Sequence, residues 1–242
     1  WTFRELMPEK NYKVIRRGFG KVTKSLGAAR DLDTYIAFLL ETRGIPEFMC
    51  FKPKIDSVIL ATKKERLRLK KLVSGSIKKI EKDLDPALLE NRLKELVKKV
   101  TPLKKMRGLA RKKISQRLKK LLSFREYAKY PHRYKKLHCL RIAAKHLRYT
   151  LENFDELYEG RLKPYIDKAH LLQDYLGDMH NYHVWGKLGR ALAVKQASGS
   201  WVKLLEDRCT DLCRRSYDLF YREWKKQGRL ETWQRLKQLI KR

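Results

Sequence analysis

The chain has 242 residues, 43% of them hydrophobic, and its 59 lysines and arginines against 27 acidic residues give a formal net charge of +32. This apolar content excludes a disordered tail, the lack of an eighteen-residue apolar run excludes a membrane-spanning helix, and four cysteines without a CxxC pair exclude a disulfide framework. With no signal-peptide pattern either, we expect a soluble cytoplasmic protein with no membrane partner. The charge predicts a polyanionic partner.

Residues 12–29 form the first predicted helix. Apolar side chains recur there at the three- and four-residue steps of one helix face: Tyr12, Ile15, Phe19, Val22, Leu26 and Ala29. Basic side chains follow the same segment and are candidates to line a groove for an anion: Arg16, Arg17, Lys21, Lys24 and Arg30. The alternative is that a chain with 59 basic residues contains some such rows by chance.

The middle of the chain is also predicted to be helical. No proline interrupts residues 54–84, which as one helix would span roughly 45 Å. Asp85-Pro86 and Thr101-Pro102 each resemble an N-cap followed by proline in the first turn, so two further helices are expected to start there. On the second of these, Arg107 and Arg111 share one face and are further candidate anion ligands.

The stretch LHCLRIAAKHLRY at 137–149 lies in a predicted helix that follows Pro131 and ends at Gly160. One apolar series repeats once per turn: Leu137, Leu140, Ala144, Leu147, Leu151 and Phe154. A second series, which we call the cationic row, lies one residue later: His138, Arg141, Lys145 and Arg148. The two stripes are about 100° apart, so the apolar stripe should pack inward and the cationic row should lie at the margin of the core. Ordinary solvated side chains are the alternative.

The last part of the chain continues the helical pattern. Pro164 is near the start of another helix, residues 196–200 are a polar connector, and residues 201–226 and 229–242 are predicted terminal helices. No segment has the pattern of a strand. The expected fold class is therefore all-α, with long helices and no sheet.

An internal repeat connects the two ends of the chain. A shift of about 150 residues maps the first apolar stripe onto Leu162, Tyr165, Ala169, Leu172, Leu176 and Met179. Leu26-Gly27 then coincides with Leu176-Gly177, and Tyr35 with Trp185. This predicts a duplication with halves 1–125 and 126–242 in a single domain, although two helices of a bundle can share a period by chance. The same offset places the counterpart of the 137–149 helix upstream of Trp1.

Three segments resemble the CHAD family, the conserved histidine α-helical domain. The pattern His-x-x-Arg-x-x-x-Lys-x-x-Arg-Tyr occurs at 138–149, Leu-Gln-Asp-x-Leu-Gly at 172–177, and Arg-Asp-x-Asp at 30–33 after a Leu-Gly pair. Two features depart from the family: its N-terminal helix has no counterpart within these 242 residues, and Asn181 stands where an acidic residue is common.

The resemblance implies a fold of two similar four-helix bundles related by a pseudo-twofold axis. It also implies a basic groove that binds inorganic polyphosphate without catalysis, with the cationic row as its ligands and Tyr149 as a packing or hydrogen-bonding neighbour. Such a groove could hold sulfate or phosphate ions, and the protein could associate with polyphosphate granules. The chemistry agrees, because a phosphate chain has no bases to read and needs only cations at regular spacing.

Two other functions stay open. Nucleic-acid binding would also explain the charge, but the chain has no zinc-finger pattern, RNA-binding sheet motif or aromatic-interleaved basic row. An enzyme acting on polyphosphate would need metal-bound carboxylates, yet Asp31 and Asp33 point to different sides of a helix. His180 and His183 have no evident third ligand for a metal, so we expect them to be surface or groove histidines. We therefore expect no catalysis, no cofactor and no metal. The sequence does not determine the oligomeric state.

Overall fold

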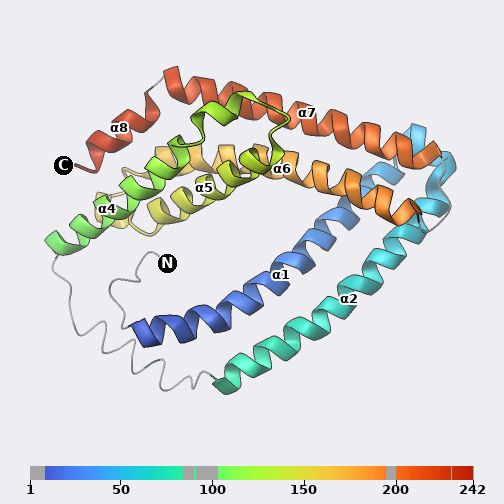
Figure 1. Ribbon diagram of the computed structural model, residues 1–242, viewed down its shortest axis with the longest axis horizontal. Helices are drawn as coiled ribbons and strands as arrows, with labels where there is room; N and C mark the ends of the chain where they lie inside the picture. The colour runs from blue at the N-terminus through green and yellow to red at the C-terminus, as the bar shows by residue number, and fades with distance from the viewer. Residues whose placement is uncertain (1–8, 84–89, 91–102, 195–199, 230, 242) are drawn as a thin grey trace. The chain divides into compact units, whose positions relative to one another are not determined.

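The structure is a computed structural model that describes residues 9–83, 90, 103–194, 200–229 and 231–241 (Figure 1). Within these ranges every regular element is helical and none is a strand, which confirms the predicted all-α class. The chain divides into two compact units, Phe3–Val100 and Thr101–Arg242, which we call unit 1 and unit 2. The halves predicted from the repeat, 1–125 and 126–242, stay a prediction.

Unit 1 contains two long helices, α1 (Glu9–Arg43) and α2 (Lys52–Asp83), joined through a 3-10 helix at Pro46–Phe51. α1 and α2 pack against each other, and their best-buried side chains lie near this connection: Tyr35, Phe38, Leu39, Phe48, Ile55 and Val58. Asp33 accepts hydrogen bonds from Arg66 Nε at 2.9 Å and Nη2 at 3.2 Å. α2 confirms the predicted helix at 54–84, whereas the predicted start at Asp85-Pro86 lies outside the described residues.

Unit 2 contains α4 (Leu103–Leu122), α5 (Tyr134–Glu152), α6 (Lys163–Val194), α7 (Ser200–Arg229) and α8 (Thr232–Leu239). α5 packs against both α4 and α6, and α6 also packs against α7. Apolar side chains are therefore needed on more than one side of α6. The core is built from Leu118, Leu140, Leu147, Leu172, Leu176, Leu205 and Phe220.

The helix after Pro131 is shorter than predicted. α5 ends at Glu152 and is followed by a 3-10 turn at Glu156–Tyr158. Gly160 comes next with φ of +74°, a left-handed conformation that favours glycine, so it closes the following loop rather than α5 itself. The apolar pattern extends past the end of α5 because Phe154, just after the helix, and Tyr158, in the 3-10 turn, are also buried.

The predicted repeat is only partly reflected in burial. Tyr35 and its counterpart Trp185 are both buried. Leu26 is 50% exposed in unit 1, whereas its counterpart Leu176 is only 2% exposed in unit 2. The duplication and its pseudo-twofold axis therefore stay predictions.

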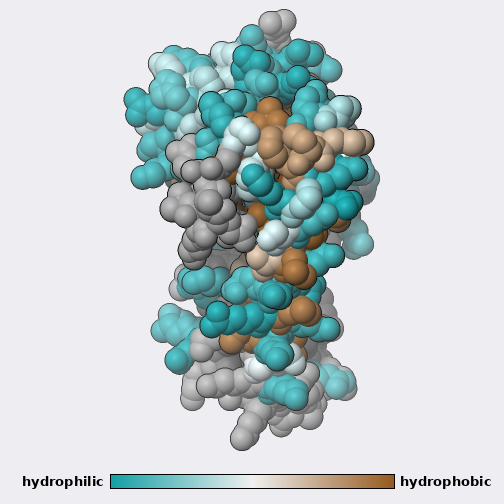
Figure 2. All heavy atoms as spheres, turned by 90° about the vertical axis from the view of Figure 1, so that its right-hand side faces the viewer, coloured by the Kyte–Doolittle hydropathy of each residue, from teal (hydrophilic) through white to brown (hydrophobic). Residues whose placement is uncertain are grey.

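On the face drawn in Figure 2, hydrophilic side chains cover most of the described area, and hydrophobic side chains appear in patches among them. Among the described residues, no helix combines the length and the apolarity needed to cross a membrane.

Candidate functional site

α5 carries the cationic row at the edge of the unit 2 core. The apolar stripe beside the row is at most 2% exposed throughout α5: Leu137, Leu140, Ala144, Leu147 and Leu151. All four members of the cationic row are half-buried: His138, Arg141, Lys145 and Arg148. This confirms that the row lies at the margin of the core, because its side chains are partly covered by protein and do not extend fully into water.

α6 forms the wall that faces the row. The rings of His138 and His180 have centroids 4.3 Å apart, and Arg148 Nε donates to Gln173 Oε1 at 3.1 Å. Because the partner's number falls as the row's number rises, α5 and α6 run antiparallel here.

Gly177 packs beside one member of the row. A Cβ built on Gly177 would lie 4.0 Å from Arg141 Cδ, and no other atom would come closer. The aliphatic part of Arg141 therefore lies close to α6 at this glycine, as arginine stems commonly lie on apolar surface while the guanidinium reaches out. Gly177 of the LQDYLG segment thus lies next to the row through the stem of Arg141.

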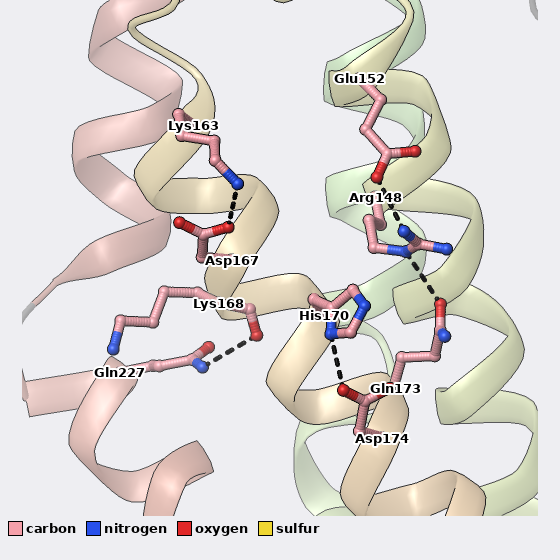
Figure 3. A network of polar contacts seen from close by, with 9 residues as sticks. All are labelled: Arg148, Glu152, Lys163, Asp167, Lys168, His170, Gln173, Asp174 and Gln227. Carbon is pink, nitrogen blue, oxygen red and sulfur yellow. Dashed lines mark hydrogen bonds and ion pairs between the residues drawn. The ribbon is translucent and has the colours of Figure 1, made fainter.

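Arg148 contacts three side chains, and two of them, Gln173 and Glu152, are drawn in Figure 3. Besides the bond to Gln173, its Nη1 donates to Glu152 Oε1 at 2.7 Å, and its guanidinium carbon lies 4.4 Å from the centroid of the Tyr149 ring. The side chain is 15% exposed. Arg148 is therefore pre-positioned, but Glu152 neutralises part of its charge.

α6 is itself held in place by contacts that continue away from the row. Gln227 of α7 donates through Nε2 to the main-chain oxygen of Lys168 at 3.2 Å and to Glu223 Oε1 at 3.0 Å. On α6, His170 Nδ1 lies 2.6 Å from Asp174 Oδ2, next to Gln173 (Figure 3). The wall facing the row is thus anchored to α7.

A second ring pair lies near the start of α5. Tyr134 stacks on His183 of α6, with centroids 3.9 Å apart and ring planes 19° apart. Together with the contact between His138 and His180, this pair packs aromatic rings between α5 and α6 from the first turn of α5. Stacked rings of this kind hold two helices at a defined separation.

The histidines of the site are surrounded by positive charge. Burial, with Arg141 and Lys145, lowers the pKa of His138. Burial, with His138, Arg141 and His183, lowers the pKa of His180 to about 4. His180 is therefore neutral at pH 7 in the free protein, and a bound polyanion would favour the charged form of both histidines.

We expect acid to destabilise the protein through His180. Its pKa is near 6.5 in an unfolded chain and about 4 when folded, so the unfolded state binds more protons between these values. Stability is complete above about pH 6.5 and falls as the pH drops towards 4. The midpoint of urea unfolding, compared at pH 7 and pH 5, should fall less in His180→Gln than in the wild type. His132→Gln, at an exposed position, should match the wild type, and equal losses in all three proteins would contradict this prediction.

A family model described as the CHAD domain matches residues 1–190. The chain belongs to the CHAD family. The match includes all of α5, which carries the cationic row, and all of the LQDYLG segment of α6, which faces it. Comparisons with curated proteins and with solved structures found no match.

The other predicted ligands of this CHAD domain are less closely grouped. Arg16, Arg17, Lys24 and Arg30 are exposed on α1 in unit 1, and the side chain of Lys21 lies outside the described part of the structure. Arg107 and Arg111 are exposed on α4. Burial raises the pKa of Tyr158, beyond the end of α5, and the charges of these two arginines partly offset that rise. Their participation in one groove with the cationic row stays a prediction.

Sequence reasoning missed the contribution of α6. Gln173 and Gly177 were noted only as parts of a motif, and for His180 and His183 a surface or groove position was expected without a contact partner. The spacing within LQDYLGDMH at 172–180, which puts Gln173, Gly177 and His180 on one helix face, was the available signal. In the described ranges, no group of three histidine, cysteine, aspartate or glutamate side chains is arranged to hold a metal ion.

Proposed function

We propose that this CHAD domain binds inorganic polyphosphate along the cationic row and does not change it chemically. One observation carries the proposal: four cationic or ionisable side chains, one per helical turn, are half-buried between a packed apolar stripe and the wall of α6. Side chains already held by packing lose less conformational freedom on binding than freely exposed lysines.

The spacing suits a phosphate chain. Neighbours on one helix face are about 5–6 Å apart, so the side chains of the row can contact phosphates at intervals along an extended polymer. Arginine can bind phosphate oxygens through two parallel hydrogen bonds, and lysine contributes a point charge. Polyphosphate has no nucleobases, so the site needs no side chains for base recognition.

The proposal extends to the wider molecule. Exposed basic residues on α1 and α4 would contribute longer-range attraction to the same polymer, and α1 with α2 would correspond to α6 with α7 in a duplicated fold with pseudo-twofold symmetry. The protein would act as a binding module in the cytoplasm, at polyphosphate granules. The net charge of +32 supports attraction to any long polyanion, and the row on α5 supports a defined site within that attraction.

A competition experiment tests the proposal. Each competitor displaces fluorescently labelled long-chain polyphosphate, and its concentration is counted in phosphate groups. Unlabelled polyphosphate should displace the label at a concentration at least about ten times lower than ATP, pyrophosphate or duplex DNA requires. The logarithm of the binding constant should also fall linearly with the logarithm of salt concentration, as counterions are released on binding.

Two results would overturn the proposal. DNA that competes as well as polyphosphate at matched salt would favour a nucleic-acid-binding protein. Metal-dependent release of phosphate from the polymer, lost in Asp31→Ala or Asp33→Ala, would instead favour an enzyme.

A further inference from the structure

A pocket of about 220 Å³ opens on the side of α5 away from the cationic row, between α5 and α4. Its apolar wall is made by Phe124, Ile142 and Ala143. Arg117 and Lys120 of α4 also line it. All of these residues belong to unit 2, and none belongs to the cationic row.

The positive charge at this pocket is not balanced by the described residues. Neither Arg117 nor Lys120 forms an ion pair with a described acidic side chain, and Lys120 Nζ instead lies 4.9 Å from the centroid of the Phe124 ring. His146 also lines the pocket, and burial, with Arg117 and Lys145, lowers its pKa. An anion bound here would reduce this repulsion.

The lining selects the chemistry of the occupant. A phosphate chain would have to lose water against Phe124, Ile142 and Ala143, which is costly for charged groups. A wholly apolar molecule would leave the two cations unpaired. A ligand with one carboxylate and a short apolar body satisfies both walls, and a volume below the usual 300–1,000 Å³ of drug-sized sites limits that body to about ten non-hydrogen atoms.

We propose that this pocket binds a small amphiphilic carboxylate, of the size of a medium-chain fatty acid. The carboxylate pairs with Arg117 and Lys120, and the hydrocarbon chain covers Ile142 and Phe124. This site is separate from the proposed polyphosphate site and does not depend on it.

Cys139 provides a reporter for the test, because its thiol is exposed and lines the pocket. Octanoate is the probe, added to the full chain, and alkylation by iodoacetamide is followed for each cysteine-containing peptide by mass spectrometry. Octanoate should slow alkylation of Cys139 at least threefold, saturating with a Kd on the order of 0.1 mM. Cys50, which is exposed in unit 1, is the internal control and should react at an unchanged rate.

Variants of the chain and analogues of octanoate distinguish binding in this pocket from general attraction to positive charge. Arg117→Gln, and independently Lys120→Gln, should weaken octanoate binding about tenfold, as measured by calorimetry. Lys119→Gln removes the same charge from an exposed position on α4 outside the pocket lining and should have no effect. The proposal is overturned if octanoate gives no protection, if octanol or octylammonium protects Cys139 equally well, or if Lys119→Gln weakens binding as much as Arg117→Gln.

Discussion

Reversing the charges of Arg141 and Arg148 together is expected to weaken polyphosphate binding about 100-fold or more. Each arginine would lose charge-assisted hydrogen bonds worth roughly 1.5–3 kcal/mol, and every 1.4 kcal/mol is a factor of ten in affinity. Both side chains are half-buried at the wall of α6, where salt screens a charge less than in open solvent. The measurement is the Kd for long-chain polyphosphate of Arg141→Glu with Arg148→Glu, at about 0.15 M salt.

The matched control lies on α2. Lys63 and Lys70 are exposed and also seven residues apart, so Lys63→Glu with Lys70→Glu changes the net charge by the same amount. This control should lose less than about fivefold in affinity, because it removes only screened long-range attraction. Equal losses in both double variants would mean that polyphosphate is held by diffuse charge. Because Arg148 also binds Gln173 and Glu152, thermal unfolding must show that the first variant is folded.

Gly177→Leu is expected to weaken polyphosphate binding about tenfold by displacing Arg141. A Cβ at this position only touches Arg141 Cδ, at 4.0 Å, but a leucine side chain extends into the space that the arginine stem occupies. Losing one positioned guanidinium costs about one charge-assisted hydrogen bond. Gly177→Ala should keep its affinity, since its Cβ makes an ordinary contact, and alanine should stabilise the helix by about 0.5–1 kcal/mol.

Gly75→Leu is the control for this substitution. Gly75 lies within α2, and a Cβ added there would meet no atom within 4 Å, so a larger side chain should be tolerated without loss of affinity. Polyphosphate titrations and thermal midpoints of Gly177→Leu, Gly177→Ala and Gly75→Leu give the comparison. Unchanged affinity in a folded Gly177→Leu protein would show that contact with α6 does not position Arg141 for binding.

The histidines suggest how the site differs from a simple basic stripe. His138 and His180 face each other with lowered pKa values, so they fill the space between the helices without adding charge at pH 7. Two charged imidazoles this close to Arg141 would repel one another and the row. The positive charge of the site therefore comes mainly from Arg141, Lys145 and Arg148.

Local periodicity was sufficient for much of the fold. The all-α class, the long helix now described as α2, and the two stripes of α5 follow from side-chain spacing alone, because a helix with 3.6 residues per turn determines which side chains share a face. The end of α5 did not follow. Buried Phe154, in the turn after Glu152, and buried Tyr158, in the 3-10 helix that follows, continue the apolar spacing, and spacing alone does not show where the α-helix ends.

The sequence by itself determined that the chain is helical and strongly basic, that it carries the family motif, and that His138, Arg141, Lys145 and Arg148 share one face of a helix at the margin of the core. Only the tertiary structure decided what faces that row. The contacts with Gln173, Gly177 and His180 cross between helices, and so does the pocket beside Arg117. Helical periodicity governs neighbours along one helix, whereas the pairing and register of two helices depend on how their buried side chains interdigitate.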